Sequence, residues 1–295
     1  MKKLSLFLNL SFFFIPACSR IDLAEAWANM YIADHIDQYF DMNSMQSLFV
    51  KKAVKEDIDK IKTEIFPGVA AELDRIELLI KSKTAVSSEQ ISRSHTEFKK
   101  IFYEGLKIFE PSAQKFVQKL SNDQIETFKK EFKKKSLELA VDLENPDGAI
   151  EKRFDVIRNQ IEIWIGSLTI EQRLLVQNFT KVNVLPLKEL IHNREKLSKE
   201  FLDSFKSSAD QRKFINTLFT NYESMLEPAY RRAAEFDLKK YFELIASVLN
   251  KLEPKQRNHL IVIISERSQE MKKMFQDNQD KKEKVRLTDF FPHSF

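Results

Sequence analysis

Apolar side chains recur every three or four residues over most of the chain, and charged side chains fill the positions between them. This is the spacing of one face of an α-helix, whereas a half-buried strand alternates apolar and polar residues one by one. In the stretch from 44 to 65, for example, helical spacing separates Leu48, Ala53, Ile58, Ile61 and Ile65. No segment shows sustained alternation. The pattern predicts an all-α fold, which we expect to be a bundle of about eight to ten helices joined by short loops.

A repeated capping signal marks where helices begin. A serine or threonine accepts a hydrogen bond from the third helical amide, and a glutamine three residues later reaches back to the amide of the capping residue. The signal occurs at Ser87 with Gln90, Ser121 with Gln124, Thr169 with Gln172 and Ser208 with Gln211, and in a looser form at Asn43 with Gln46. We expect a helix to start at each of these places.

Proline and glycine mark further boundaries. Pro146 and Pro254 suit the first position of a helix, where no amide proton is needed, and Gly166 suits the end of one. Several of the predicted helices are long, and prolines inside their patterns should bend or split them. These prolines are Pro67, Pro111, Pro186 and Pro228.

The beginning of the chain has the pattern of a bacterial lipoprotein signal. Lys2 and Lys3 give a positive start, and residues 4–15 form an apolar run shorter than the roughly 20 residues that a membrane-spanning helix needs. The stretch Ile-Pro-Ala-Cys at 15–18 resembles a lipobox, in which the cysteine is acylated and becomes the new amino terminus. Cys18 is therefore predicted to be a lipid attachment point. The alternatives are a secretory signal with an incidental cysteine and a buried helix with a free thiol.

This interpretation divides the chain into three parts: a signal peptide at 1–17, a helical periplasmic domain at 18–275 and a polar, flexible tail at 276–295. More than one acyl chain, such as palmitate, would make the anchoring stable. By resemblance to the proteobacterial sorting rule, Ser19 favours the outer membrane. We expect an envelope protein that faces the periplasm, with the membrane and other envelope proteins as its partners. The oligomeric state stays open.

The composition excludes several classes of function. Four glycines supply neither the G-x-S-x-G turn of a serine hydrolase nor a glycine-rich phosphate loop. A single cysteine excludes an internal disulfide and a cysteine-rich zinc site. Without the signal peptide, 46 basic residues stand against 44 acidic ones, so the chain has no overall field to attract nucleic acid. We expect no nucleic-acid partner and no cofactor.

Two groups of polar residues could carry chemistry. Asp34, His35 and Asp37 form an acidic cluster in the first predicted helix and could serve in acid/base catalysis. Glu189 and His192 place a carboxylate and an imidazole on one helical face, as in di-iron bundles, but such a site needs a second fragment of this kind and the chain has none. An ordinary polar surface explains both groups more simply. We therefore expect no catalytic residue and no metal site.

The capping phrases carry a first resemblance. The phrase Leu-Thr-Ile-Glu-Gln at 168–172 and its near copy at 120–124 resemble the L-T-x-x-Q motifs of the small periplasmic stress chaperones of the Spy and CpxP type. The same phrase is also a capping box that follows a leucine, so helix physics alone could produce the likeness.

A broader resemblance extends over most of the chain to about residue 205. Its marks are Cys18, the phrase at 37–46, the phrase that begins Trp-Ile-Gly at 164–172 and the His-Asn-Arg of 192–194. Together they resemble an uncharacterised family of bacterial lipoproteins, the domain of unknown function numbered sixty-two seventy-nine. The chain departs from that pattern at 65–67, where Ile-Phe-Pro stands near the place of a W-H-R phrase. The family implies no activity.

We expect from these features a non-catalytic protein-binding module, either chaperone-like or a scaffold. One alternative is an envelope enzyme that acts on peptidoglycan or a related substrate, using Asp34 with His35 or Glu189 with His192. A second alternative is a purely structural spacer.

Overall fold

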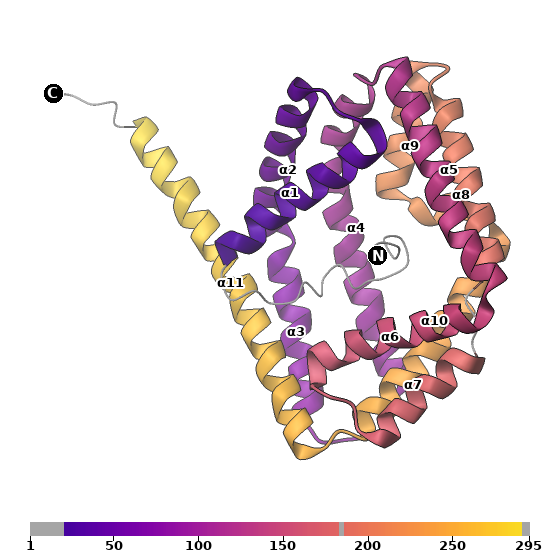
Figure 1. The fold of residues 1–295 in the computed structure, drawn as a ribbon. Helices are drawn as coiled ribbons and strands as arrows, with labels where there is room; N and C mark the ends of the chain where they lie inside the picture. Colours follow the sequence, from indigo (N-terminus) through magenta and orange to yellow (C-terminus); the bar gives the residue numbers. More distant parts are fainter. Residues whose placement is uncertain (1–20, 183–185, 291–295) are drawn as a thin grey trace.

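The computed structural model describes residues 21–182 and 186–290 and consists of helices joined by short loops (Figure 1). Its eleven α-helices are α1 (Ile21–Phe40), α2 (Ser44–Glu64), α3 (Phe66–Lys81), α4 (Ser88–Val117), α5 (Asn122–Glu144), α6 (Pro146–Ile165), α7 (Ile170–Val182), α8 (Leu187–Ser204), α9 (Ser208–Thr220), α10 (Pro228–Asn250) and α11 (Pro254–Phe290). A short 3-10 helix, η2 (Tyr222–Met225), precedes α10. No strand occurs in the two described ranges, so the predicted all-α fold is confirmed, with slightly more helices than expected.

Four of the five predicted capping boxes are present. Asn43, Ser87, Ser121 and Thr169 each accept from the amide of the glutamine three residues later, and each glutamine side chain accepts from the amide of its capping residue. The fifth prediction is wrong by one residue. Ser207, not Ser208, caps α9, because Asp210 stands three residues after Ser207 and bonds to it through both its amide and its carboxylate.

The prolines and the glycine act at helix boundaries, with one exception. Ile65 separates α2 from α3 just before Pro67, and Pro228 is the first residue of α10. Gly166 ends α6 with a positive φ of 78° that suits glycine. Pro111 is the exception, since α4 continues through it.

Two hydrophobic cores lie one after the other along α4. The first core is formed by side chains of α3, α6, α7, α10 and α11, and α4 contributes Phe98 to it. The second core is formed by α1, α2, α8 and α9, and α4 contributes Phe116 to it. A helix of this length extends about 45 Å, which is enough to serve both cores. Phe40 stacks on Phe128 in the second core, with ring centroids 5.3 Å apart, and Phe201 packs edge-on to Phe128 at 4.6 Å.

A pair of buried glutamines joins two helical hairpins at each core. The side chains of Gln46 and Gln124 donate to each other over 2.9 and 2.7 Å, and those of Gln172 and Gln256 over 2.9 Å in both directions. Each glutamine also donates to a loop carbonyl of the opposite hairpin, two residues before that hairpin's capping residue. These four acceptors are Lys119, Asp41, Lys251 and Ser167. The α1–α2 and α4–α5 turns, which the first pair joins, lie at one end of the molecule, and the α6–α7 and α10–α11 turns, which the second pair joins, lie at the other (Figure 1).

The polar stretch after residue 275, expected to be a flexible tail, continues α11 as far as Phe290. Asn278 in this stretch is buried, and its amide donates to the Asp59 carbonyl and the Thr63 hydroxyl of α2 over 2.7 and 2.9 Å. The end of α11 extends beyond the rest of the molecule (Figure 1). None of the described helices is both long enough and apolar enough to cross a bilayer.

Candidate functional site

The predicted anchor and sorting residues, Cys18 and Ser19, lie outside the described residues. The structure therefore bears only on the predicted polar groups of α1 and α8.

The polar group of α1 is spread over different roles. Asp34 is exposed. His35 stacks on Tyr31 at 5.9 Å between ring centroids and meets Tyr39 edge-on at 5.7 Å. Asp37 accepts a 2.8 Å hydrogen bond from the Met42 amide, just past the end of the helix. His35 thus belongs to a row of aromatic rings, and Asp37 helps to end α1.

The polar group of α8 is also superficial. His192 is exposed and Glu189 is half-buried. Within the described ranges, no three His, Cys, Asp or Glu side chains gather closely enough to hold a metal ion. The residue after His192 is the structural one: Asn193 is 1 % exposed, and its side-chain oxygen accepts a 2.8 Å bond from the Glu227 amide.

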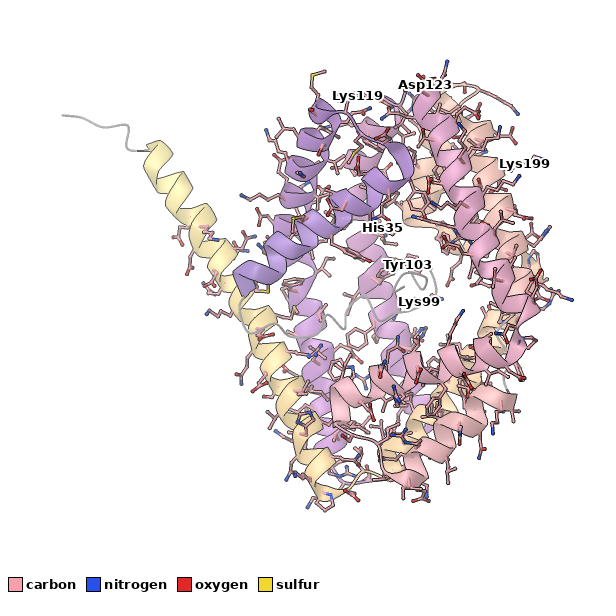
Figure 2. All side chains as sticks on the ribbon, viewed as in Figure 1. His35, Lys99, Tyr103, Lys119, Asp123 and Lys199 are labelled. Atoms are coloured by element: carbon pink, nitrogen blue, oxygen red, sulfur yellow. The ribbon has the colours of Figure 1, made fainter. Side chains whose placement is uncertain are left out.

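A different set of polar groups meets where α4 faces η2. Lys99 of α4 forms an ion pair with Glu223 of η2, and the carboxylate of Glu223 is also hydrogen-bonded to the Tyr103 hydroxyl. Lys99 and Tyr103 lie one turn apart on α4, with His35 of α1 above them in the view of Figure 2. Burial, followed by the negative charge of Glu223, raises the pKa of Tyr103 above its usual value. Tyr103 is therefore a neutral hydrogen-bond donor at neutral pH.

His95 lies one turn before Lys99 on α4. Its ring packs against Phe242, with centroids 5.0 Å apart. Burial, assisted by the positive charge of Lys99 and opposed by Glu223, lowers the pKa of His95 from 6.5 to about 4. His95 is therefore neutral at physiological pH.

Next to this contact lies a second group, which we call the Arg194 cluster: Arg194 of α8, Tyr222 of η2 and Tyr230 of α10. The Nε and Nη2 atoms of Arg194 are buried and have no hydrogen-bond partner within the described part of the chain. The hydroxyl of Tyr230, a residue only 2 % exposed, is in the same situation. Tyr222 interacts electrostatically with Arg194 and with Tyr230. Burial raises the pKa of Tyr222 to about 12, although the positive charge of Arg194 opposes this shift.

Neighbouring helices hold the Arg194 cluster in place. The guanidinium of Arg194 lies over the ring of Phe132 in α5, 4.6 Å from its centroid. Lys196, also of α8, donates to the Met225 carbonyl over 2.7 Å, so that α8 is tied to the η2 segment through both Asn193 and Lys196. Chemically, the cluster offers several hydrogen-bond donors and one positive charge in a place that is largely closed to water.

Sequence reasoning missed this cluster. The His-Asn-Arg phrase at 192–194 contributes to a family resemblance, but its arginine carries no signal of a site in the sequence alone. Tyrosines at 222 and 230 carry no motif, and their approach to Arg194 depends on how α8, η2 and α10 pack.

Comparison with known proteins gives one match. A family model described as a family of unknown function, DUF6279, matches residues 38–231, a range that contains α2 to α9 and the whole Arg194 cluster. No curated protein matches the chain. No solved structure matches it.

Proposed function

The chain belongs to the DUF6279 family of unknown function, and from this premise we propose that it is a bacterial envelope lipoprotein whose helical body binds other envelope proteins without catalysing a reaction. In this proposal acylated Cys18 anchors the protein, and the body faces the periplasm from the outer membrane. The support for the anchor is the order of features in the first eighteen residues, from the two lysines through the apolar run to the lone cysteine.

The observation that carries the binding role is a set of exposed apolar side chains at both ends of the molecule. Met45 and Leu48 in the first turns of α2 are 80 % and 71 % exposed, and Ile170 and Leu174 in the first turns of α7 are 81 % and 51 % exposed. The members of each pair are three or four residues apart and so lie on one face of their helix. Large apolar side chains held together in water are typical of protein interaction sites.

The glutamine pairs make these two faces rigid. Leu48 and Leu174 each follow a paired glutamine, Gln46 or Gln172, by two residues. Because both glutamines are buried, their side chains are unavailable to a binding partner. The L-T-x-x-Q phrase here caps a helix and joins two hairpins through its glutamine. Any likeness to the Spy and CpxP chaperones would have to lie in the exposed residues beside it.

The enzyme alternative has less support from the geometry. Asp37 is engaged at the end of α1, His35 is packed between two tyrosines, and His192 is exposed on α8. Acid/base catalysis needs such groups to converge on one reacting atom.

The test is cross-linking in living cells, followed by mass spectrometry of the partners captured by the full-length protein. Many unrelated envelope proteins would indicate a chaperone-like binder, and one dominant partner would indicate a scaffold. The double variants Met45→Ser/Leu48→Ser and Ile170→Ser/Leu174→Ser should lose most of the captured partners. Leu137→Ser is the matched control, since Leu137 is 58 % exposed and lies about four turns after the start of α5, far from both tested pairs.

Two results would overturn the binding proposal. One is the capture of no partner by the natural protein, and the other is an unchanged set of partners in both double variants. A Cys18→Ala variant, run in parallel, shows which partners depend on the anchor.

A further inference from the structure

Two arginines of this protein present the same edge of the guanidinium in opposite states. In Arg75, Nε and Nη2 donate side by side to the two carboxylate oxygens of Glu72, over 2.8 and 2.6 Å. In Arg194, the same two nitrogens are buried and meet no acceptor in the described ranges. This edge matches the two oxygens of a carboxylate or a phosphate, and such paired bonds to a charged group are among the strongest hydrogen bonds in proteins.

A vacant edge of this kind is unfavourable in a folded protein. Arginine cannot lose its proton at physiological pH, so burial leaves a charge that has given up its water. Buried charges are normally paired, because a charge without a partner is strongly destabilising. In the described ranges, the Nε and Nη2 atoms of Arg194 therefore lack an acceptor, which a bound ligand could supply.

Two carboxylates beside the tyrosines of this region are already paired with other cations. Glu223 is bound by Lys99 and by the Tyr103 hydroxyl. Asp237, which acts electrostatically on Tyr230, receives two bonds of 2.6 and 2.8 Å from Arg153. Neither carboxylate is placed to serve the Nε and Nη2 atoms of Arg194.

The surroundings of Arg194 favour an incoming anion. The Tyr230 hydroxyl is a further buried donor without an acceptor in the described ranges, and Tyr222 interacts electrostatically with both Tyr230 and Arg194. The guanidinium carbon of Arg194 lies 4.6 Å from the centroid of the Phe132 ring, and Nε and Nη2 still have no hydrogen-bond partner in the described ranges. The unpartnered groups are a guanidinium edge and a hydroxyl, which can both donate to an anion, and the positive charge of the guanidinium disfavours a cation.

We propose that the Arg194 cluster binds the oxyanion group of a ligand, a carboxylate or a phosphate, through the Nε–Nη2 edge of Arg194. This site is separate from the exposed apolar faces of α2 and α7, and it extends the function beyond protein binding. It lies at the junction of α5, α8, η2 and α10, so an occupied site would tie α8 more firmly to the η2 segment.

The test is anion binding by the full-length protein, purified in a neutral detergent at pH 7. Inorganic phosphate, acetate and chloride are compared at equal ionic strength, by titration calorimetry and by the shift in Tm. We expect phosphate or acetate, at millimolar concentrations, to bind and to raise the Tm above its value in chloride. Binding of phosphate alone indicates a phosphate-bearing ligand, and binding of acetate alone indicates a carboxylate.

Three variants assign the binding to the site. Arg194→Met and Arg194→Lys should each weaken anion binding by roughly tenfold or more. Methionine removes both the charge and the donors, whereas lysine keeps the charge and loses the paired donor geometry. Arg212→Met is the matched control, since it removes one positive charge from an exposed position on α9 and should leave binding unchanged. If Arg194→Met does not fold, Arg194→Lys carries the test.

The proposal is overturned if neither anion binds the natural protein better than chloride, or if the Arg194 variants bind as well as Arg212→Met does. Neither result would bear on the protein-binding proposal, whose variants lie on α2 and α7.

Discussion

At the scale of single residues, two arginines differ in how their guanidinium groups are paired. Arg153 is paired twice with Asp237 and also lies over the ring of Phe179, 4.7 Å from its centroid. Arg194 has the ring of Phe132 and no acceptor at its Nε–Nη2 edge within the described residues. A paired guanidinium holds two elements together, whereas buried donors without a partner point to an acceptor that the described residues do not supply.

His95 makes the stability of the protein depend on pH. Its pKa is about 4 in the folded state and close to 6.5 in the unfolded chain, so between these values the unfolded chain binds more protons. The contribution of neutral His95 is fully present above pH 6.5 and is lost as the pH falls from 6.5 through about 4. We expect a loss of about 1–2 kcal/mol in the free energy of unfolding, since part of the side chain is exposed and a full shift would be screened.

Denaturant titrations of the natural protein and of His95→Gln, between pH 4 and pH 7, measure this effect. Carboxylates titrate in the same range, so the quantity to follow is the difference between the two proteins. That difference should change with pH in the stated direction. A constant difference would show that His95 does not titrate differently in the folded and unfolded states.

At the scale of elements, the side chain of a paired glutamine both caps its own helix and bonds to a second hairpin. The Gln172 oxygen accepts from the Thr169 amide, while its amide group donates to Gln256 and to the Lys251 carbonyl. Each hairpin start therefore depends on the hairpin that it meets. The same arrangement recurs at Gln46 and Gln124, where the partners are also close to eighty residues apart in sequence.

Gln172→Ala should lower the free energy of unfolding by about 2–4 kcal/mol, because it leaves buried groups of two hairpins without partners. Gln90→Ala is the matched control: Gln90 caps α4 in the same way but bonds only within its own box, so the loss should be about 1 kcal/mol or less. Denaturant unfolding measures both. The double variant Gln172→Ala/Gln256→Ala should cost less than the two single changes added together, and strict additivity would argue against a shared contact.

The same elements show how far the sequence predicts the fold. Helix starts at Asn43, Ser87, Ser121 and Thr169 were predicted because a capping box is local, and its bonds join residues three apart. The start predicted at Ser208 is wrong by one residue, because Asp210 bonds to the hydroxyl of Ser207. The pairing of the boxes could not be predicted, since it depends on which hairpins pack together.

The candidate site was less predictable than the fold, for a related reason. The sequence points to residues whose side chains commonly take part in catalysis or metal binding, namely Asp34, His35, Asp37, Glu189 and His192. In the structure Asp37 ends a helix, His35 stacks on tyrosines and His192 is exposed. Arg194 and Tyr230 stand out only when their burial and their missing acceptors are known, and both properties arise from packing.

At the scale of the whole molecule, the position of α1 limits how a lipid anchor could hold the protein. Two residues separate Cys18 from Ile21, where α1 begins. Three residue steps span at most about 11 Å. If Cys18 is acylated, the start of α1 is therefore held against the membrane surface, and the helical body cannot reach partners across the periplasm by means of a long tether.

Acylation of Cys18 can be tested by substitution. Cys18→Ala should abolish incorporation of radiolabelled palmitate and weaken the association with the membrane fraction, because stable anchoring in this proposal depends on the acyl chains. Ser19→Asp should keep the label and move the protein to the inner membrane, whereas Ser19→Thr should leave it at the outer membrane. Labelling that survives in Cys18→Ala would refute the anchor. Labelling that is lost in Cys18→Ala, together with an unchanged location of Ser19→Asp, would keep the anchor and refute the role of Ser19 in sorting.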